Sequence, residues 1–143
     1  MRITRLASIL ALGLLAACQS AGEEGNGAPT PAFDGIAAEE TVHFTGTEPF
    51  WGGTIANGAA LYTTPENNEG SSFQVERFAG LNGVSFSGKL DDTSFDLMVT
   101  PGECSDGMSD RTYPYVATLM LGDEKREGCA WTDSQPFTGD AMP

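Results

Sequence analysis

Short β-prone runs, separated by turn residues about every eight to twelve positions, fill residues 41–135 and restrict this region to all-β folds. Apolar and polar residues alternate within several runs, so that Phe95, Leu97 and Val99 share one face of an expected strand. The 3.6-residue spacing of an amphipathic helix is not found there. The expected strands cover residues 41–45, 50–55, 59–63, 72–78, 84–89, 94–100, 115–121 and 125–131.

The turn signals indicate how these strands are connected. Asn57-Gly58 and Asn82-Gly83 predict two-residue hairpins, because both residue types accept the positive φ of a type I′ turn. Eight short antiparallel strands predict a small closed or nearly closed barrel, which removes exposed sheet edges, with a two-sheet sandwich as the alternative. We expect one domain at residues 41–135 and a C-terminal tail at residues 136–143.

The first residues have the composition of an export signal. Arg2 and Arg5 precede an apolar stretch, Leu6 to Ala17, that is too short to span a bilayer as a helix, which predicts a signal peptide at residues 1–17. The string Leu15-Ala16-Ala17-Cys18 resembles the bacterial lipobox, whose cysteine receives the lipid. The resemblance implies a palmitate-type anchor on Cys18, a protein held at the membrane without spanning it, and, with Gln19 next, an outer-membrane lipoprotein facing the periplasm.

The segment from the cysteine to Glu40 predicts a tether. Residues 18–40 are rich in Gly, Ala, Pro and Glu, and Phe33 and Ile36 are their only sizeable apolar side chains. Such a composition does not bury enough surface to order itself. A flexible coil of about 22 residues would hold the domain about 25 Å from the membrane on average.

The three cysteines divide into one lipid site and one expected disulfide. With Cys18 lipidated, Cys104 and Cys129 remain in an oxidising compartment, where disulfides persist. The bridge would close a loop of about 26 residues, which stabilises the fold by about 3.5 kcal/mol on the chain-entropy model. Two thiols and the single His43 are too few for a structural zinc site, so we expect no metal and no other cofactor. His43 is expected to be a half-buried strand residue.

The charge of the chain limits its partners. Removal of the leader leaves five basic residues against twenty acidic ones, a net charge of −15 compared with −13 for the whole chain. Nucleic acid is excluded as a partner, because phosphate binding needs a basic face. A surface of this sign attracts basic proteins or divalent cations, but we favour the simpler interpretation of a solvated acidic exterior.

Residues 103–115, ECSDGMSDRTYPY, form the most unusual stretch. Asp106 and Gly107 suit a tight turn, with the Asp side chain accepting hydrogen bonds from amides ahead of it. Arg111 is expected to pair with Asp110 or to reach Glu48, and the pair is expected to be covered by Tyr113, Tyr115 and Trp51. We favour a structural loop over a ligand site. The cluster expected to carry either role comprises Glu48, Trp51, Asp106, Asp110, Arg111 and Tyr113.

Two strings together carry a family resemblance. They are GTEPFW, from Gly46 to Trp51, and CSDGMSDRTYP, from Cys104 to Pro114, followed by Gly128-Cys129-Ala130. In this order and spacing, residues 44–131 resemble a family of uncharacterised bacterial lipoproteins and periplasmic proteins. The resemblance implies an exported, disulfide-bonded domain, and it implies no activity, substrate or catalytic residue.

These features favour a binding or interaction module of the cell envelope over an enzyme, with no catalytic residues. His43 lies in an expected strand and no nucleophile motif accompanies it. Basic proteins such as lysozymes are the expected partners, because lipid-anchored lysozyme inhibitors share the tether, the small barrel and a disulfide. The alternative is a small-ligand or divalent-cation binding protein, or an enzyme, that uses Glu48, Asp106 and Asp110.

Overall fold

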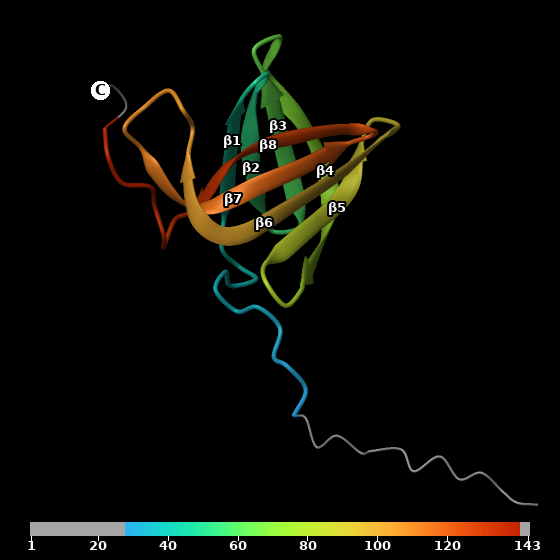
Figure 1. Cartoon of the computed structure of the whole chain (residues 1–143). Helices are drawn as coiled ribbons and strands as arrows, with labels where there is room; N and C mark the ends of the chain where they lie inside the picture. The colour runs from blue at the N-terminus through green and yellow to red at the C-terminus, as the bar shows by residue number, and fades with distance from the viewer. Residues whose placement is uncertain (1–27, 141–143) are drawn as a thin grey trace, which may run out of the picture.

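A computed structural model describes residues 28–140, and the expected signal peptide and Cys18 lie outside them. The described residues form a closed barrel of eight antiparallel strands, each paired with its neighbours in the sequence, and the last strand closes on the first (Figure 1). The strands are β1 (Val42–Thr47), β2 (Phe50–Ala56), β3 (Ala59–Thr64), β4 (Asn67–Ala79), β5 (Val84–Leu90), β6 (Thr93–Ser105), β7 (Thr112–Leu121) and β8 (Glu124–Thr132). Within this part of the chain, no helix is long and apolar enough to cross a membrane.

The closed barrel confirms the predicted fold class and the number of strands, and the sandwich alternative is wrong. The Asn57-Gly58 turn is also as predicted, with φ of 52° and 75°. The turn at Asn82-Gly83 differs: it spans residues 80–83, and Gly80 donates its amide to the carbonyl of Gly83 at 2.9 Å. Strands β4, β6 and β7 are longer than predicted, and β6 changes register on β7 between Pro101 and Cys104.

Side chains from all eight strands fill the barrel, so its interior is a packed core. Phe95 lies near its centre and is fully buried, with ring centroids 4.9 Å from Phe73, 5.9 Å from Tyr62 and 6.4 Å from Phe44. The alternation read from the sequence therefore corresponds to the inward and outward faces of the strands.

Residues 33–40 close one end of the barrel, which we call the plugged end. Ile36 is 1% exposed and belongs to the core, and its carbonyl accepts a hydrogen bond from Nη2 of Arg77 at 2.7 Å. The amide of Phe33 donates to the carbonyl of Gly80 at 2.7 Å. The prediction of a disordered tether up to Glu40 is therefore wrong for its last eight residues, because Ile36 completes the core.

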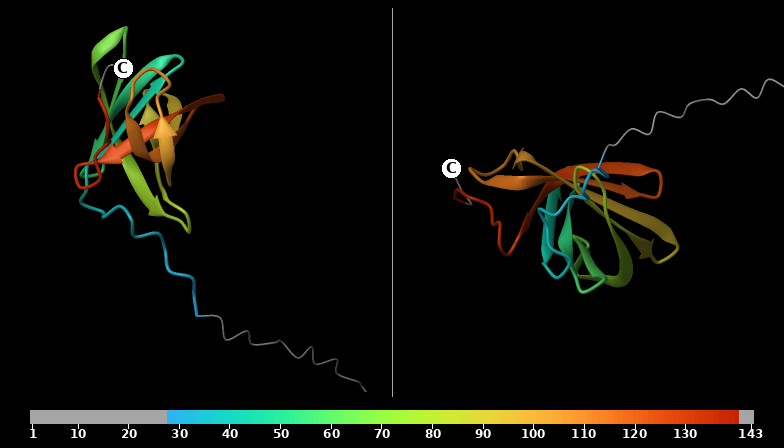
Figure 2. Two further views of the ribbon diagram at one scale, coloured as in Figure 1. Left: turned by 60° about the vertical axis from the view of Figure 1, so that its left-hand side comes forward. Right: turned by 90° about the horizontal axis from the view of Figure 1, so that it is seen from below.

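The C-terminal residues also belong to the folded unit. Thr138 exchanges two backbone hydrogen bonds with Thr112, at 2.9 and 3.0 Å, so the segment after β8 runs beside the start of β7. The end of the β6–β7 hairpin projects from the barrel wall with this segment next to it (Figure 2). The tail predicted from residue 136 onward is thus ordered at least as far as Thr138.

Candidate functional site

Asp106 organises the projecting loop between β6 and β7. Its Oδ1 accepts hydrogen bonds from the amides of Met108 and Ser109 at 2.9 and 2.8 Å. Its Oδ2 accepts from the hydroxyls of Ser109 and Tyr113 at 2.7 and 3.1 Å. The Ser109 hydroxyl, followed by the two amides, lowers the pKa of Asp106 to about 2. The predicted Asp turn is present, and its carboxylate is occupied by the loop itself.

The predicted disulfide between Cys104 and Cys129 is confirmed and lies at the base of this loop. The two Cα atoms are 5.6 Å apart, within the usual range for a disulfide. Cys104 belongs to β6 and Cys129 to β8, so the bridge crosses the intervening β7. The loop is therefore fixed both by its own hydrogen bonds and by a covalent link to the barrel.

The ion pair predicted for Arg111 is not formed. Between residues 28 and 140 the ion pairs are His43–Asp133, Lys125–Glu127 and Arg126–Glu124. The guanidinium of Arg111 instead lies 4.3 Å from the centroid of the Phe137 ring, a cation–π contact. The C-terminal segment docks beside the start of β7 and brings the Phe137 ring against the guanidinium of Arg111. Neither Glu48 nor Asp110 places a carboxylate within ion-pair distance of it.

An aromatic cluster covers the outside of this region and was not predicted. Trp131, Tyr113 and Phe137 contact one another, with ring centroids 5.3 to 5.4 Å apart. His43 stacks on Trp131 at 5.1 Å, and its Nε2 lies 2.8 Å from a carboxylate oxygen of Asp133. The His43 side chain is 25% exposed, so the prediction of a half-buried strand residue is confirmed.

Burial raises the pKa of Tyr113, and the neighbouring Asp106 carboxylate raises it further against the opposing effect of Arg111. Tyr113 thus joins the aromatic cluster to the loop as a neutral hydrogen-bond donor.

Trp51 belongs to the barrel core and not to the loop. It is 3% exposed, and its ring centroid lies 5.7 Å from that of Phe44. A Cβ atom on Gly46 would collide with Nε1 of Trp51, so the glycine of the GTEPFW string leaves room for the indole. This burial excludes Trp51 as an exposed platform for a ligand.

The six predicted cluster residues are therefore divided among several places. Asp106, Arg111 and Tyr113 lie together, whereas Glu48 is in the β1–β2 turn, Trp51 is in the core and Asp110 is exposed on the loop. In the part of the chain that the structure describes, no three His, Cys, Asp or Glu side chains form a group that could hold a metal ion. Glu48, Asp106 and Asp110 consequently do not form the joint site that the cation or enzyme alternative requires.

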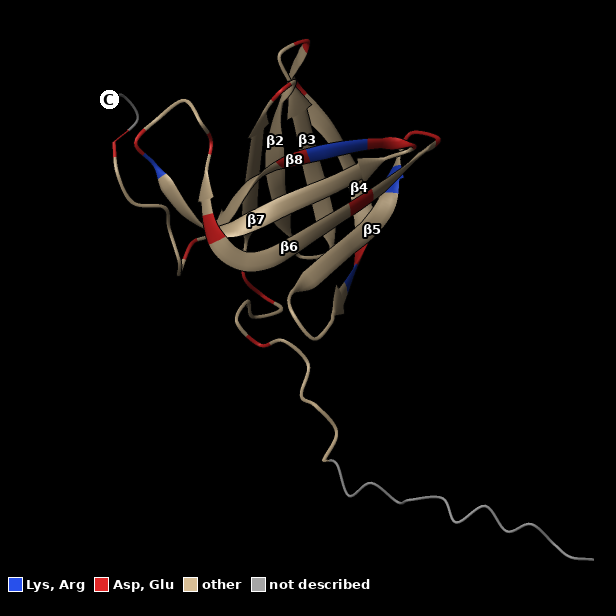
Figure 3. Ribbon diagram, in the orientation of Figure 1, with Lys and Arg blue, Asp and Glu red and all other residues tan. Residues whose placement is uncertain are grey.

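The end of the barrel opposite the plugged end is acidic, and we call it the acidic rim. It consists of four two-residue turns, Glu48-Pro49, Pro65-Glu66, Asp91-Asp92 and Gly122-Asp123, and each contains at least one exposed carboxylate (Figure 3). They gather at one end because successive turns of an up-and-down barrel alternate between its two ends. The number of these charges follows from the sequence, whereas their position at one end follows from the closure of the barrel.

Two of the basic residues beside the acidic rim, Arg126 and Lys125, are already paired, whereas Lys89 near the end of β5 makes no ion pair within residues 28–140. Arg126 donates from Nε and Nη2 to the two carboxylate oxygens of Glu124, each at 3.0 Å, and from Nη1 to the hydroxyl of Tyr62 at 2.5 Å. Lys125 lies 2.6 Å from Glu127. Arg126 lowers the pKa of Glu124, and Lys125 lowers that of Glu127. None of the carboxylates in the four rim turns takes part in an ion pair within residues 28–140.

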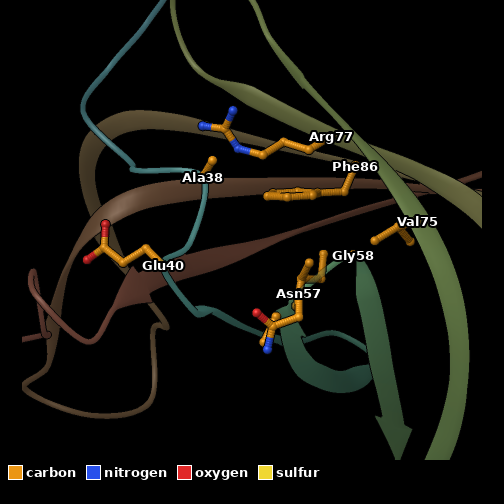
Figure 4. Close-up of a pocket in the computed structure, with 9 residues that line it drawn as sticks. Ala38, Glu40, Asn57, Gly58, Val75, Arg77 and Phe86 are labelled. Carbon is orange, nitrogen blue, oxygen red and sulfur yellow. The ribbon is translucent and has the colours of Figure 1, made fainter.

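The hollows of the molecule are small or open. The hollow at the plugged end has a volume of about 70 Å³ and lies between Ala38, Arg77 and Phe86 (Figure 4). Ligand pockets in proteins usually measure about 300–1,000 Å³. The carboxylate of Glu40 at its edge is bonded to the amide and hydroxyl of Ser134, which lowers the pKa of Glu40, and it makes no ion pair with Arg77. This hollow does not have the size of a small-molecule site.

No protein-family model, curated protein or solved structure matches the chain. What the molecule does is therefore inferred from its own surface and from the placement of its charged side chains.

Proposed function

We propose that the protein is an envelope lipoprotein that captures basic proteins through its acidic rim. The observation that carries the proposal is the presence of exposed carboxylates without a cationic partner in all four turns of one barrel end. Residues 28–140 contain eighteen acidic and five basic residues, a net charge of −13, which adds a long-range field to these local contacts. Such a field speeds association with a partner of opposite sign and selects against acidic ones.

The proposed anchor completes this arrangement. The signal peptide at residues 1–17 is removed, Cys18 carries the lipid, and the domain stays at the periplasmic face of the outer membrane. The resemblance to exported bacterial lipoproteins through the GTEPFW and CSDGMSDRTYP strings supports this location. The described residues enter the barrel at the plugged end, which supports an orientation with the acidic rim directed away from the proposed anchor.

Lysozymes are the basic proteins that we propose as partners. They act on the cell envelope, and lipid-anchored lysozyme inhibitors share the small barrel, the tether and a disulfide with this chain, a likeness of architecture alone. The β6–β7 loop offers a second point of contact, since Met108 is 60% exposed on a loop that is already fixed by Asp106 and the disulfide. A preorganised loop loses little conformational entropy on binding.

Calorimetric titration of the mature protein with a basic lysozyme, at low and at high salt, tests the proposal. The triple variant Asp91→Asn, Asp92→Asn, Asp123→Asn removes three rim charges. The matched control Glu76→Gln, Asp96→Asn, Glu103→Gln removes three exposed charges from the barrel wall. We expect the rim variant to weaken binding about tenfold or more and the control to weaken it about threefold or less.

Two outcomes would contradict the proposal. If both triple variants weaken binding equally, net charge alone attracts the lysozyme and the acidic rim is not a site. If an excess of the protein leaves lysozyme activity unchanged and calorimetry detects no binding, lysozyme is not a partner.

A further inference from the structure

The β4–β5 hairpin at the plugged end carries the two most exposed large apolar side chains of the described residues. Phe78 is 68% exposed and Leu81 is 67% exposed. The stretch from Phe78 to Ser87 contains no charged residue. Arg77, which precedes it, points its guanidinium toward the plug and donates to the carbonyl of Ile36. The tip of this hairpin is therefore apolar on a molecule that is otherwise strongly acidic.

A third exposed apolar side chain, Met98, lies on the same outer face, two strands away from Phe78. Phe78 pairs with Ser85, and Ser85 pairs with Met98, so these three residues form a row across the outer face of β4, β5 and β6. Met98 is 47% exposed. Exposed apolar side chains that gather on one side of a soluble domain mark a place of contact with a protein or a membrane.

The plug places this tip next to the beginning of the anchor segment. The Phe33 amide is bonded to the carbonyl of Gly80, within the turn that carries Leu81. The chain that leads back to Cys18 therefore leaves the folded unit at the hairpin tip. Fourteen residues lie between Cys18 and Phe33, and such a length spans at most about 50 Å in any conformation.

We propose that Phe78 and Leu81 insert into the interface of the bilayer that holds the lipid on Cys18. The inference rests on the lipid anchor of the proposed function, and it is independent of the basic partner. The occupant is a zwitterionic phospholipid surface, because the net charge of −13 and the exposed Asp34 and Glu39 near the plug repel an anionic one. Insertion fixes the plugged end on the membrane and presents the acidic rim away from it.

Depth-dependent fluorescence quenching tests the insertion. The mature chain is coupled through the thiol of Cys18 to maleimide lipid in phosphatidylcholine vesicles that contain brominated acyl chains, because Cys104 and Cys129 are joined in a disulfide. Leu81→Trp reports on the hairpin tip. Met108→Trp is the matched control, since Met108 is similarly exposed, at 60%, on the β6–β7 loop. Trp51 and Trp131 contribute the same background to both variants.

We expect the emission of Leu81→Trp to shift to shorter wavelength and to lose about half its intensity on brominated vesicles, with little change for Met108→Trp. Equal quenching of the two variants, or none in either, overturns the proposal. A blue shift of Leu81→Trp without vesicles, together with a dimer in sedimentation, also overturns it, because the patch is then an interface between two copies.

The lipid anchor and the insertion of the hairpin tip are tested by separate measurements, and the anchor is tested on the natural protein extracted from membranes. Mass spectrometry that finds no lipid on Cys18 refutes the anchor, whereas the quenching experiment on the chemically coupled chain still reports on the tip. Quenching in vesicles that contain anionic lipid is expected to be weaker. Stronger quenching there would contradict the assignment to a zwitterionic surface.

Discussion

The charge of Asp106 holds the β6–β7 loop in its conformation. Its carboxylate accepts four hydrogen bonds from groups of the same hairpin, which explains why its pKa falls from 3.8 to about 2. Because the folded state lowers this pKa, the stabilisation is fully present above about pH 3.8 and is lost as the pH falls toward 2.

The substitution Asp106→Asn tests this role. It keeps the size of the side chain but removes the charge, and we expect a loss of about 1–2 kcal/mol of unfolding free energy at pH 7. The difference from the unmodified protein should shrink at pH 2, where Asp106 is about half protonated in the folded protein and largely protonated in the unfolded chain. Urea denaturation at both pH values measures it. Asp110→Asn, on the exposed part of the same loop, is the control and should cost less than about 0.5 kcal/mol. An equal loss at both pH values would show that the charge is not the cause.

Contacts between residues close in the sequence, and the disulfide, could be predicted from the sequence. Contacts that depend on how distant segments pack could not. The Asp106 turn and the Cys104–Cys129 bridge follow from residue types and from the count of cysteines. The contact of Arg111 with Phe137 depends on where the C-terminal segment docks. A single apolar residue such as Phe137 shows no periodicity that would reveal its docking.

At the scale of elements, the strands were predictable because alternation and turn residues are local signals. The extra residues of β4, from Asn67 to Gly70, were not, since Asn, Glu and Gly are poor strand formers and their pairing is set by β3. The plug at residues 33–40 was missed for a similar reason. Its one fully buried side chain, Ile36, lies among small and polar residues that suggest disorder.

The contribution of the plug to the fold is measurable through Ile36. The substitution Ile36→Ala removes a side chain that is 1% exposed at the end of the core, and we expect a loss of about 2–4 kcal/mol in chemical denaturation. Ala38→Ser changes an exposed position in the same segment and should cost less than about 0.5 kcal/mol. If the two variants unfold at the same denaturant concentration, residues 33–40 do not contribute to the stability of the barrel.

At the scale of the whole molecule, one end of the barrel is acidic and the other carries the plug and the apolar hairpin tip. This polarity follows from the topology, since an up-and-down barrel sends alternate turns to opposite ends. Two of the three turns that leave the plugged end, Asn57-Gly58 and residues 80–83, contain no charge, and the third, the projecting β6–β7 loop, contains Asp106, Asp110 and Arg111. Each turn of the acidic rim contains at least one carboxylate. Because alternate turns lie at opposite ends, the proposed membrane contact and the proposed contact with a basic partner lie at opposite ends of the barrel.

The uneven charge predicts opposite effects of salt on stability and on binding. Eighteen acidic residues against five basic ones repel one another in the folded domain, and salt screens this repulsion over a Debye length that falls from about 30 Å at 0.01 M to about 8 Å at 0.15 M. We expect the melting temperature to rise over this range by a few degrees, because about 1 kcal/mol of stability corresponds to roughly 4–8 °C in a domain of this size. Binding of a basic lysozyme should weaken over the same range, since salt screens that attraction as well.

The rim variant Asp91→Asn, Asp92→Asn, Asp123→Asn should melt at a higher temperature at low salt and respond less to added salt in both measurements. If salt instead lowers the melting temperature, favourable ion pairs such as Arg126–Glu124 outweigh the repulsion among the carboxylates.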